Sequence, residues 1–153
     1  MDTRRQKGNQ GEAAAQALLE RQGYRIVDVN VRFGSRRDGL PGEIDIVAWD
    51  GPTLCFVEVK ARRGNTFATP YEAVTPAKQR QIARLALAYA AHHGLLGDAA
   101  EVPLRFDIVA VTLSPGREDP GNNGASSGVV SLVRRAELVR GAFLAPDDFA
   151  DGF

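Results

Sequence analysis

Two strand-like segments near the middle of the chain carry side chains that could perform hydrolytic chemistry. Asp45 lies in the first segment, and Glu58 and Lys60 follow it in the second, 13 and 15 positions further along the chain. Carboxylates are ligands that Mg²⁺ and Mn²⁺ prefer, and residues two apart on a strand point to the same side. These residues therefore suit metal-assisted hydrolysis of a phosphodiester, in which a cation and a lysine stabilise the charge that builds on phosphorus.

The turn between the two segments predicts their register. If the turn is centred on the bond after Gly51, Asp45 opposes Glu58 and Glu43 opposes Lys60, with all four side chains on one face. The opposite face is expected to be apolar: Ile44, Ile46, Ala48, Cys55, Val57 and Val59. Two opposed carboxylates about 5 Å apart repel by roughly 3 kcal/mol at an effective dielectric near 20. Protonation, Lys60 or a divalent cation could relieve this repulsion; an ordinary ion-pair network is the alternative interpretation.

The remaining hydrophobic patterns predict the elements that position this hairpin. A helix over residues 10–21 is expected to be capped by Asn9, with Glu12 as its reciprocal partner in a capping box. A second helix is expected to start at Pro76, after a threonine N-cap, and to run to about His93. Strands are expected over residues 24–32, 42–49, 53–61 and 104–113, with a final edge strand over 129–133. This order predicts an α/β domain with a mixed sheet.

Length and composition indicate one globular domain. The 153 residues are expected to hold a core over about 7–113, a flexible loop over 114–128, and a C-terminal strand and tail over 129–153. No apolar run resembles a signal sequence or a membrane span, and the single cysteine, Cys55, offers no intramolecular disulfide. The expected location is therefore the cytoplasm, without membrane association.

The formal net charge is zero, but the charges are unevenly distributed. Residues 41–59 hold four acids and no base, whereas residues 1–40 hold eight Lys/Arg against five Asp/Glu and residues 60–84 hold six against one. Basic flanks could bind a polyanion while a cation occupies the acidic segment. An ordinary solvated surface explains the same pattern about equally well. The residues expected to contact nucleic acid are Arg32, Arg36, Arg37, Arg62, Arg63, Lys78 and Arg80.

Several motifs together resemble a known family. They are Lys7-Gly8-x-x-Gly11-Glu12, Gly23-Tyr24, Asn30-x-Arg32, Gly42-Glu43-Ile44-Asp45, Phe56-Val57-Glu58-Val59-Lys60-x-Arg62, Glu72-Ala73-Val74 with Lys78, and Arg105-Phe106-Asp107. In this order they are similar to the YraN-like family of predicted endonucleases, relatives of the Holliday-junction resolvase branch of the PD-(D/E)-x-K nucleases. The resemblance implies a restriction-endonuclease-like core, with a mixed central sheet flanked by a helix on each side.

The resemblance also implies roles for individual residues. Asp45 and Glu58 would bind Mg²⁺ or Mn²⁺ with the main-chain carbonyl of Val59, Lys60 would be the catalytic lysine, and Glu12 would be an acid contributed by the first helix. The implied activity is metal-dependent endonucleolytic hydrolysis of DNA, structure-selective and acting in repair or recombination. A non-catalytic nucleic-acid-binding accessory protein on the same fold is the alternative, and a protein-interaction module is a third hypothesis. Resolvase relatives are dimers, so a homodimer is one expectation, although no exposed apolar stripe demands it.

Overall fold

The computed structural model describes residues 3–33, 39–64, 69, 74–97, 102–114 and 132–145, with only the backbone described for residues 3–8. Its elements, in chain order, are α1 (Thr3–Arg21), β1 (Arg25–Phe33), β2 (Leu40–Asp50), β3 (Thr53–Arg63), α2 (Pro76–His92), β4 (Leu104–Leu113) and β5 (Val133–Phe143). The predicted order of helices and strands is confirmed. The expected loop over 114–128 lies almost wholly outside the described residues.

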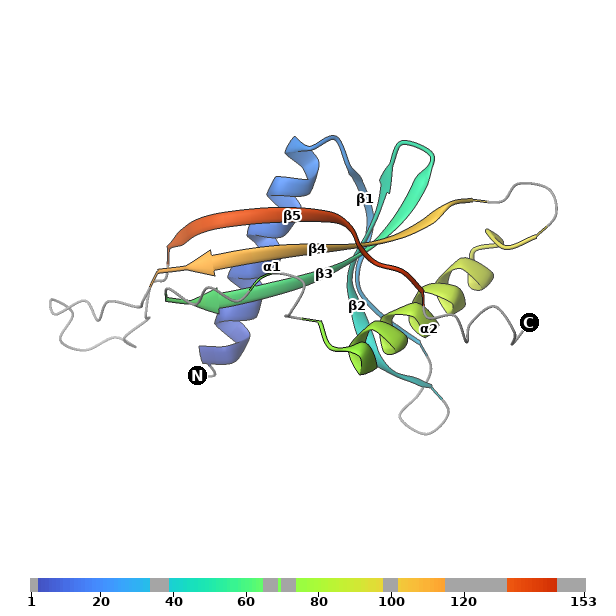
Figure 1. The fold of residues 1–153 in the computed structure, drawn as a ribbon, viewed down its shortest axis with the longest axis horizontal. Coiled ribbons are helices and arrows are strands. Elements are labelled where there is room, and N and C mark those ends of the chain that lie inside the picture. Colours follow the sequence, from blue (N-terminus) through green and yellow to red (C-terminus); the bar gives the residue numbers. More distant parts are fainter. Residues whose placement is uncertain are drawn as a thin grey trace, which may run out of the picture.

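A five-stranded mixed sheet forms the centre of the fold, in the order β1-β2-β3-β4-β5 (Figure 1). β3 and β4 are parallel, and every other neighbouring pair is antiparallel. The parallel pair requires a crossover, which α2 supplies. The predicted α/β class with a mixed sheet is therefore confirmed.

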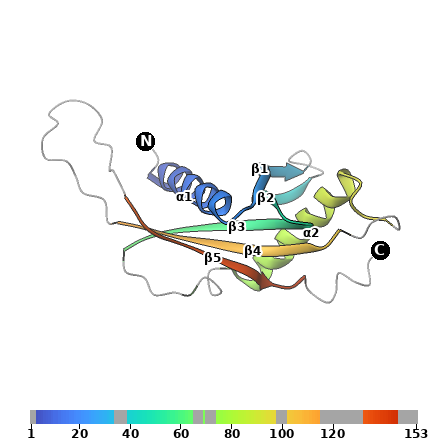
Figure 2. The ribbon, with the colours of Figure 1, turned by 90° about the horizontal axis from the view of Figure 1, so that it is seen from above.

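The two helices cover opposite faces of the sheet (Figure 2). Alternate residues of β3 belong to different hydrophobic clusters: Phe56 packs with residues of α2, whereas Val57 packs with residues of α1. This alternation follows from the two-residue period of a strand. Because both faces are covered, the central strands β3 and β4 are largely buried.

The first helix is longer than the sequence pattern predicted. α1 begins at Thr3, so Asn9 lies inside the helix, and the predicted capping box between Asn9 and Glu12 is wrong. Arg, Gln and Lys residues before Asn9 have good helix propensity and carry the helix back beyond the apolar stripe that set the predicted start. Glu12 consequently lies near the middle of α1, and its side chain is not needed to cap the helix.

The second helix agrees with its prediction. The Thr75 side chain caps α2 by accepting a hydrogen bond from the Lys78 N–H at 3.3 Å, and Pro76 occupies the first turn. The helix ends at His92, with His93 as its C-cap, and Gly94 follows with a φ of +66°. A glycine adopts this left-handed conformation without the steric penalty of a side chain.

Several strand boundaries differ from their predictions, most of all in β2 and β5. The gap between the strands predicted over residues 24–32 and 42–49 is shortened, because Phe33 belongs to β1 and β2 already includes Leu40 and Pro41. The final edge strand runs over Val133–Phe143, so its predicted end at residue 133 is wrong, and residues 129–131 of the prediction lie outside the described residues. Four of its eleven residues are charged and interrupt the apolar pattern of a strand, whereas antiparallel pairing with β4 stabilises it.

Candidate metal centre

Three carboxylates from α1 and β2 come together on the α1 side of the sheet. The nearest ligand atoms of Glu12, Glu43 and Asp45 all lie within 4.8 Å of one another, and the three residues are half-buried. Two ligands on opposite sides of Mg²⁺ are separated by about 4.2 Å, twice the metal–oxygen distance of about 2.1 Å. The cluster therefore needs only small adjustments to hold a divalent cation, and its oxygen donors suit Mg²⁺ or Mn²⁺.

Close packing of α1 against β3 places Glu12 in this cluster. A Cβ atom on Gly11 would lie 2.7 Å from the Ala61 Cβ, so a glycine is needed for the helix to approach the strand this closely. The next residue, Glu12, accepts a hydrogen bond of 3.4 Å from the side-chain amide of Asn30. Burial raises the pKa of Glu12, and the negative charges of Asp45 and Glu43 add to the effect, while the Asn30 hydrogen bond opposes it.

Glu43 is held by an arginine from the neighbouring strand. The Glu43 Oε2 atom lies 2.8 Å from Arg32 Nε and 2.7 Å from Arg32 Nη2. Gly42, immediately before Glu43, has a φ of +92°, and a Cβ there would come within 2.6 Å of the Gln81 side chain on α2. Arg32, predicted to contact nucleic acid, thus lies at the acidic centre.

Asp45 lies where the backbone pairing of β2 with β3 ends. The predicted register is confirmed from Asp50–Thr53 to Ile46–Val57, which is the last described pair. Beyond it, the Asp45 carboxylate accepts a hydrogen bond of 2.8 Å from the Val59 N–H. Burial raises the pKa of Asp45 to about 7, with a further contribution from the charge of Glu58, while the Val59 hydrogen bond lowers it. Asp45 therefore titrates near neutral pH.

Glu58 lies next to Asp45, and its charge and a hydrogen bond between the two side chains help to raise the pKa of Asp45. The Glu58 carboxylate is 6% exposed and lies 3.5 Å from the Lys60 ammonium and 4.0 Å from the Lys78 ammonium of α2. Lys78, which was predicted to contact nucleic acid, lies beside Glu58, and its contact with nucleic acid stays a prediction.

The prediction that Ile44 and Ile46 share one apolar face is wrong, whereas Asp45 and Glu58 lie next to each other, as the predicted register requires. Ile44 packs in the α2-side cluster with Val47, whereas Ile46 packs on the α1 side. The side-chain alternation therefore breaks between Ile44 and Ile46.

Other predicted residues lie further from the centre or outside the described chain. Arg62 and Arg63 are half-buried at the end of β3, and Arg80 is exposed on α2. Arg36 and Arg37 lie outside the described residues. The backbone N–H of Val59 contacts Asp45, while the suggested role of its carbonyl as a metal ligand stays a prediction.

A second buried polar cluster, which we call the Asp107 network, surrounds Asp107 on β4. Asp107 is fully buried and accepts hydrogen bonds from the Tyr24 hydroxyl at 2.9 Å, Arg105 Nε at 2.8 Å and the Gly141 N–H at 2.8 Å. Asp107 is thus paired with Arg105, the base two residues before it on β4. Its alternation with Arg105 along β4 was the sequence signal, whereas Tyr24 carried no such signal.

Two more residues extend the Asp107 network from other strands. Arg105 Nη2 donates to Asp50 at 2.7 Å, and Arg140 Nε donates to the Tyr24 hydroxyl at 3.1 Å. Burial raises the pKa of the neighbouring Cys55 thiol to about 12, so the thiol stays protonated and inert, as its apolar position predicted. Each acid of this network has an arginine partner, which indicates a structural role.

Fold and site together define an α/β protein with a mixed five-stranded sheet, a helix on each face, and an acidic group that could hold a metal ion. Residues 11–111 match the model described as "Uncharacterised protein family UPF0102", and the chain belongs to this family. The matched range includes all four residues predicted to be catalytic. Neither helix in the described part of the chain is long and apolar enough to cross a membrane.

Relatives from several bacteria match this chain over most of its length. A UPF0102 protein of Symbiobacterium thermophilum is 45% identical over 141 residues, covering 92% of this chain and 98% of the relative. A UPF0102 protein of Moorella thermoacetica is 46% identical over the same length, with the same coverage. A UPF0102 protein of Geobacter sulfurreducens is 50% identical over 109 residues, covering 71% of this chain and 77% of the relative.

Proposed function

We propose that this protein is a Mg²⁺- or Mn²⁺-dependent endonuclease that hydrolyses DNA phosphodiesters. The observation that carries the proposal is the group formed by Glu12, Glu43 and Asp45, whose ligand atoms lie within 4.8 Å of one another. Three converging carboxylates repel one another unless a cation or protons compensate their charge. A divalent cation bound there would polarise a phosphoryl oxygen and lower the pKa of a bound water.

The alternative of a self-sufficient ion-pair network fits these acids less well. In such a network the bases would lower the pKa of the acids, whereas burial and neighbouring charges raise the pKa of Asp45 and of Glu12. Within the described part of the chain, Glu12 and Asp45 have hydrogen bonds from Asn30 and Val59 but no ion pair. In the described part of the chain no base compensates the negative charge of these two acids, and a bound metal ion would compensate it.

Lys60 and Glu58 supply the remaining groups for hydrolysis. The Lys60 side chain is one-third exposed, at 33%, and its ammonium is held 3.5 Å from Glu58. In this role Lys60 orients the attacking water and stabilises negative charge on the phosphoryl group. Glu58, almost fully buried next to Asp45, holds Lys60 and Lys78 in place and adds negative charge beside the centre.

A DNA strand would approach the centre through the basic residues around it. Arg32 and Lys78 already lie beside the acids, and Arg80 follows on the exposed side of α2. Cationic side chains near a phosphate backbone raise affinity without reading sequence, because they release bound counterions. Binding should therefore weaken steeply as salt is added.

The decisive experiment combines metal binding with cleavage. Calorimetry with Mn²⁺ is expected to detect binding by the wild type and loss of binding in Asp45→Asn. A panel of branched, nicked and single-stranded DNAs should be cut by the wild type with Mg²⁺ or Mn²⁺, and not by Glu58→Ala or Lys60→Ala. Glu137→Gln is a matched control, because Glu137 is an exposed acid paired with Arg135 on β5.

Two results would separate the proposal from its alternatives. If Mn²⁺ does not bind, or binds equally to Asp45→Asn, the metal centre is refuted and the acids are an ion-pair network. If the metal binds but every DNA stays intact, while binding to DNA survives Asp45→Ala and Glu58→Ala, the protein is a non-catalytic accessory on the same fold.

A further inference from the structure

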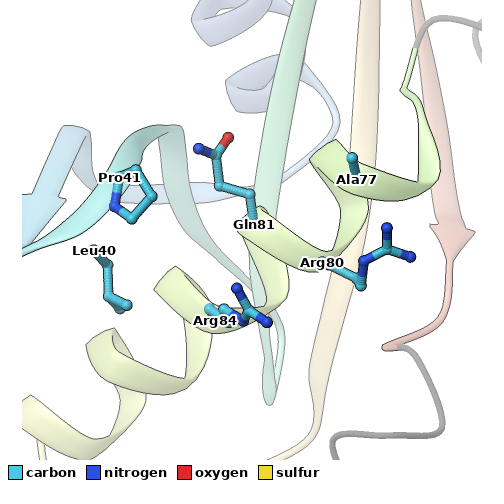
Figure 3. A pocket seen from close by; sticks show the side chains of 6 residues that line it. All are labelled: Leu40, Pro41, Ala77, Arg80, Gln81 and Arg84. Carbon is cyan, nitrogen blue, oxygen red and sulfur yellow. The ribbon is translucent and has the colours of Figure 1, made fainter.

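A pocket of about 300 Å³ lies between the start of β2 and the exposed side of α2 (Figure 3). It is lined by Leu40, Pro41, Ala77, Arg80, Gln81 and Arg84. Its volume is at the lower end of the range of small-molecule sites, about 300–1,000 Å³. The pocket can therefore hold one nucleotide-sized group rather than a long segment of polymer.

The two arginines give this pocket a strong preference for an anion. Arg80 and Arg84 are four residues apart on α2, so they are neighbours on the helix surface, where like charges destabilise the helix. Both side chains are exposed, and among the described residues no acid pairs with either of them. A phosphate would relieve this repulsion and could accept two parallel hydrogen bonds from each guanidinium group.

The remaining walls suit the other parts of a nucleotide. Leu40 and Pro41 present apolar surface, and Leu40 is 36% exposed although it is a large hydrophobic residue. Gln81 extends from α2 toward Pro41 (Figure 3), and its side chain packs against Gly42. An amide carries both a donor and an acceptor, the combination that can recognise a base edge.

We propose that this pocket binds a single unpaired nucleotide, with its phosphate on Arg80 and Arg84 and its base against Leu40 and Pro41. A base inside a duplex is stacked and paired, so it enters a pocket only when single-stranded or flipped out. Because Pro41 is separated from Glu43 by one residue, the bound nucleotide lies close to the acidic centre. Resting on the proposed nuclease function, this inference names its substrate class: DNA with an unpaired segment beside the cleaved bond.

Fluorescence anisotropy can test the pocket without relying on cleavage. The probes are a labelled oligothymidylate single strand and a fully paired duplex of the same length, titrated with the full chain in Ca²⁺ over a series of salt concentrations. The test variant carries Arg80→Ala with Arg84→Ala. The control carries Arg21→Ala with Arg134→Ala, which removes the same charge from exposed positions on α1 and β5.

We expect the wild type to bind the single strand more tightly than the duplex. The test variant should bind the single strand about tenfold more weakly than the wild type does, with little change in affinity for the duplex. The salt dependence of single-strand binding should fall by about 0.7 in slope, since both arginines contact one phosphate and each neutralised phosphate contributes about 0.7. The control variant should keep the preference for the single strand.

The pocket proposal is overturned if the test variant binds the single strand like the wild type, if the control variant loses as much, or if the duplex loses equally. Cleavage assays on the same proteins separate the two proposals. A single-strand preference that depends on Arg80 and Arg84, without cleavage of any DNA, would support the pocket and refute the nuclease. If the wild type cleaves DNA and the test variant still prefers the single strand over the duplex, the pocket proposal alone is refuted.

Discussion

Two polar clusters lie along the same strand, β2, and they differ in how far positive side chains compensate their negative charge. Asp45 belongs to the acidic centre, and Asp50, about 16 Å further along the strand, belongs to the Asp107 network. In the network, Arg105 pairs with both Asp50 and Asp107. In the acidic centre, Glu12, Glu43 and Asp45 converge with one arginine, Arg32, on Glu43.

This difference indicates different purposes. A buried acid that is fully paired stabilises one arrangement of the strands, and removing its partner is costly. A group of acids without sufficient positive charge lowers the stability of the metal-free protein and is retained where a cation or a reaction requires it. We therefore assign structure to the Asp107 network and function to the acidic centre, and the following predictions test that assignment.

The largest effect is expected from breaking the Asp107 network. Arg105→Ala leaves Asp107 buried without its base and should lower the free energy of unfolding by about 3–5 kcal/mol. Urea denaturation in EDTA measures the change. Arg135→Ala, which removes an exposed arginine from an ion pair on β5, should change stability by less than about 1 kcal/mol. Equal effects of the two variants would contradict the structural role of the network.

Neutralising an acid of the metal centre should change the free energy of unfolding in the opposite direction and raise it. Asp45→Asn keeps an acceptor for the Val59 N–H but removes the charge that Glu58 and Glu43 repel. At about pH 8 without metal we expect this variant to be more stable than the wild type by about 1–2 kcal/mol. Glu137→Gln is the control and should be neutral. A less stable Asp45→Asn protein would show that this acid is structural.

The same charge should make stability depend on pH. Because the pKa of Asp45 is raised to about 7 in the folded protein, the folded state holds its proton more tightly than the unfolded state. The stabilisation is complete below the unfolded pKa of about 4 and is lost as the pH rises through about 7. Denaturation in EDTA should therefore show falling stability between about pH 4 and pH 7, with a flatter profile for Asp45→Asn.

Mn²⁺ should reverse this trend, because a metal binds the deprotonated carboxylate. The increase in melting temperature caused by Mn²⁺ is therefore expected to grow as the pH rises through about 7. An increase that does not vary with pH would place the metal at other residues.

The smallest effect is expected at Arg32. Its side chain is 75% exposed, so the ion pair with Glu43 should contribute less than about 1 kcal/mol to stability. Arg32→Ala should nevertheless raise the affinity for Mn²⁺ by a few-fold in calorimetry, because the arginine no longer competes for the Glu43 carboxylate. Lower affinity would instead assign Arg32 to stabilising the bound form of the centre.

Local sequence patterns were sufficient for much of the fold. Thr75 and Pro76 predicted the start of α2, and the turn at Gly51 predicted the register from Asp50 to Ile46, because capping and turn chemistry act within a few residues. β5 was misplaced because its charged residues become a strand only by pairing with β4. The start of α1 was misplaced because the helix continues beyond the apolar stripe that the prediction followed.

The residues of the candidate site were predictable from the sequence, but their arrangement in space was not. Asp45, Glu58, Lys60 and Glu12 were recognisable from residue type, spacing and resemblance. The break in alternation between Ile44 and Ile46, by contrast, was signalled by no local pattern. The Lys78 contact with Glu58 depends in turn on how α2 lies across the sheet.

The sequence by itself determined the hairpin, its apolar pairs, and the acids and lysine it carries, because these follow from the two-residue period of a strand and the chemistry of a turn. Only the tertiary structure decided that Glu12 joins Glu43 and Asp45, and that Tyr24 and Arg140 converge near Asp107. These residues are far apart in the chain, and the distances between them are set by the packing of helices on the sheet. A local sequence pattern does not predict that packing.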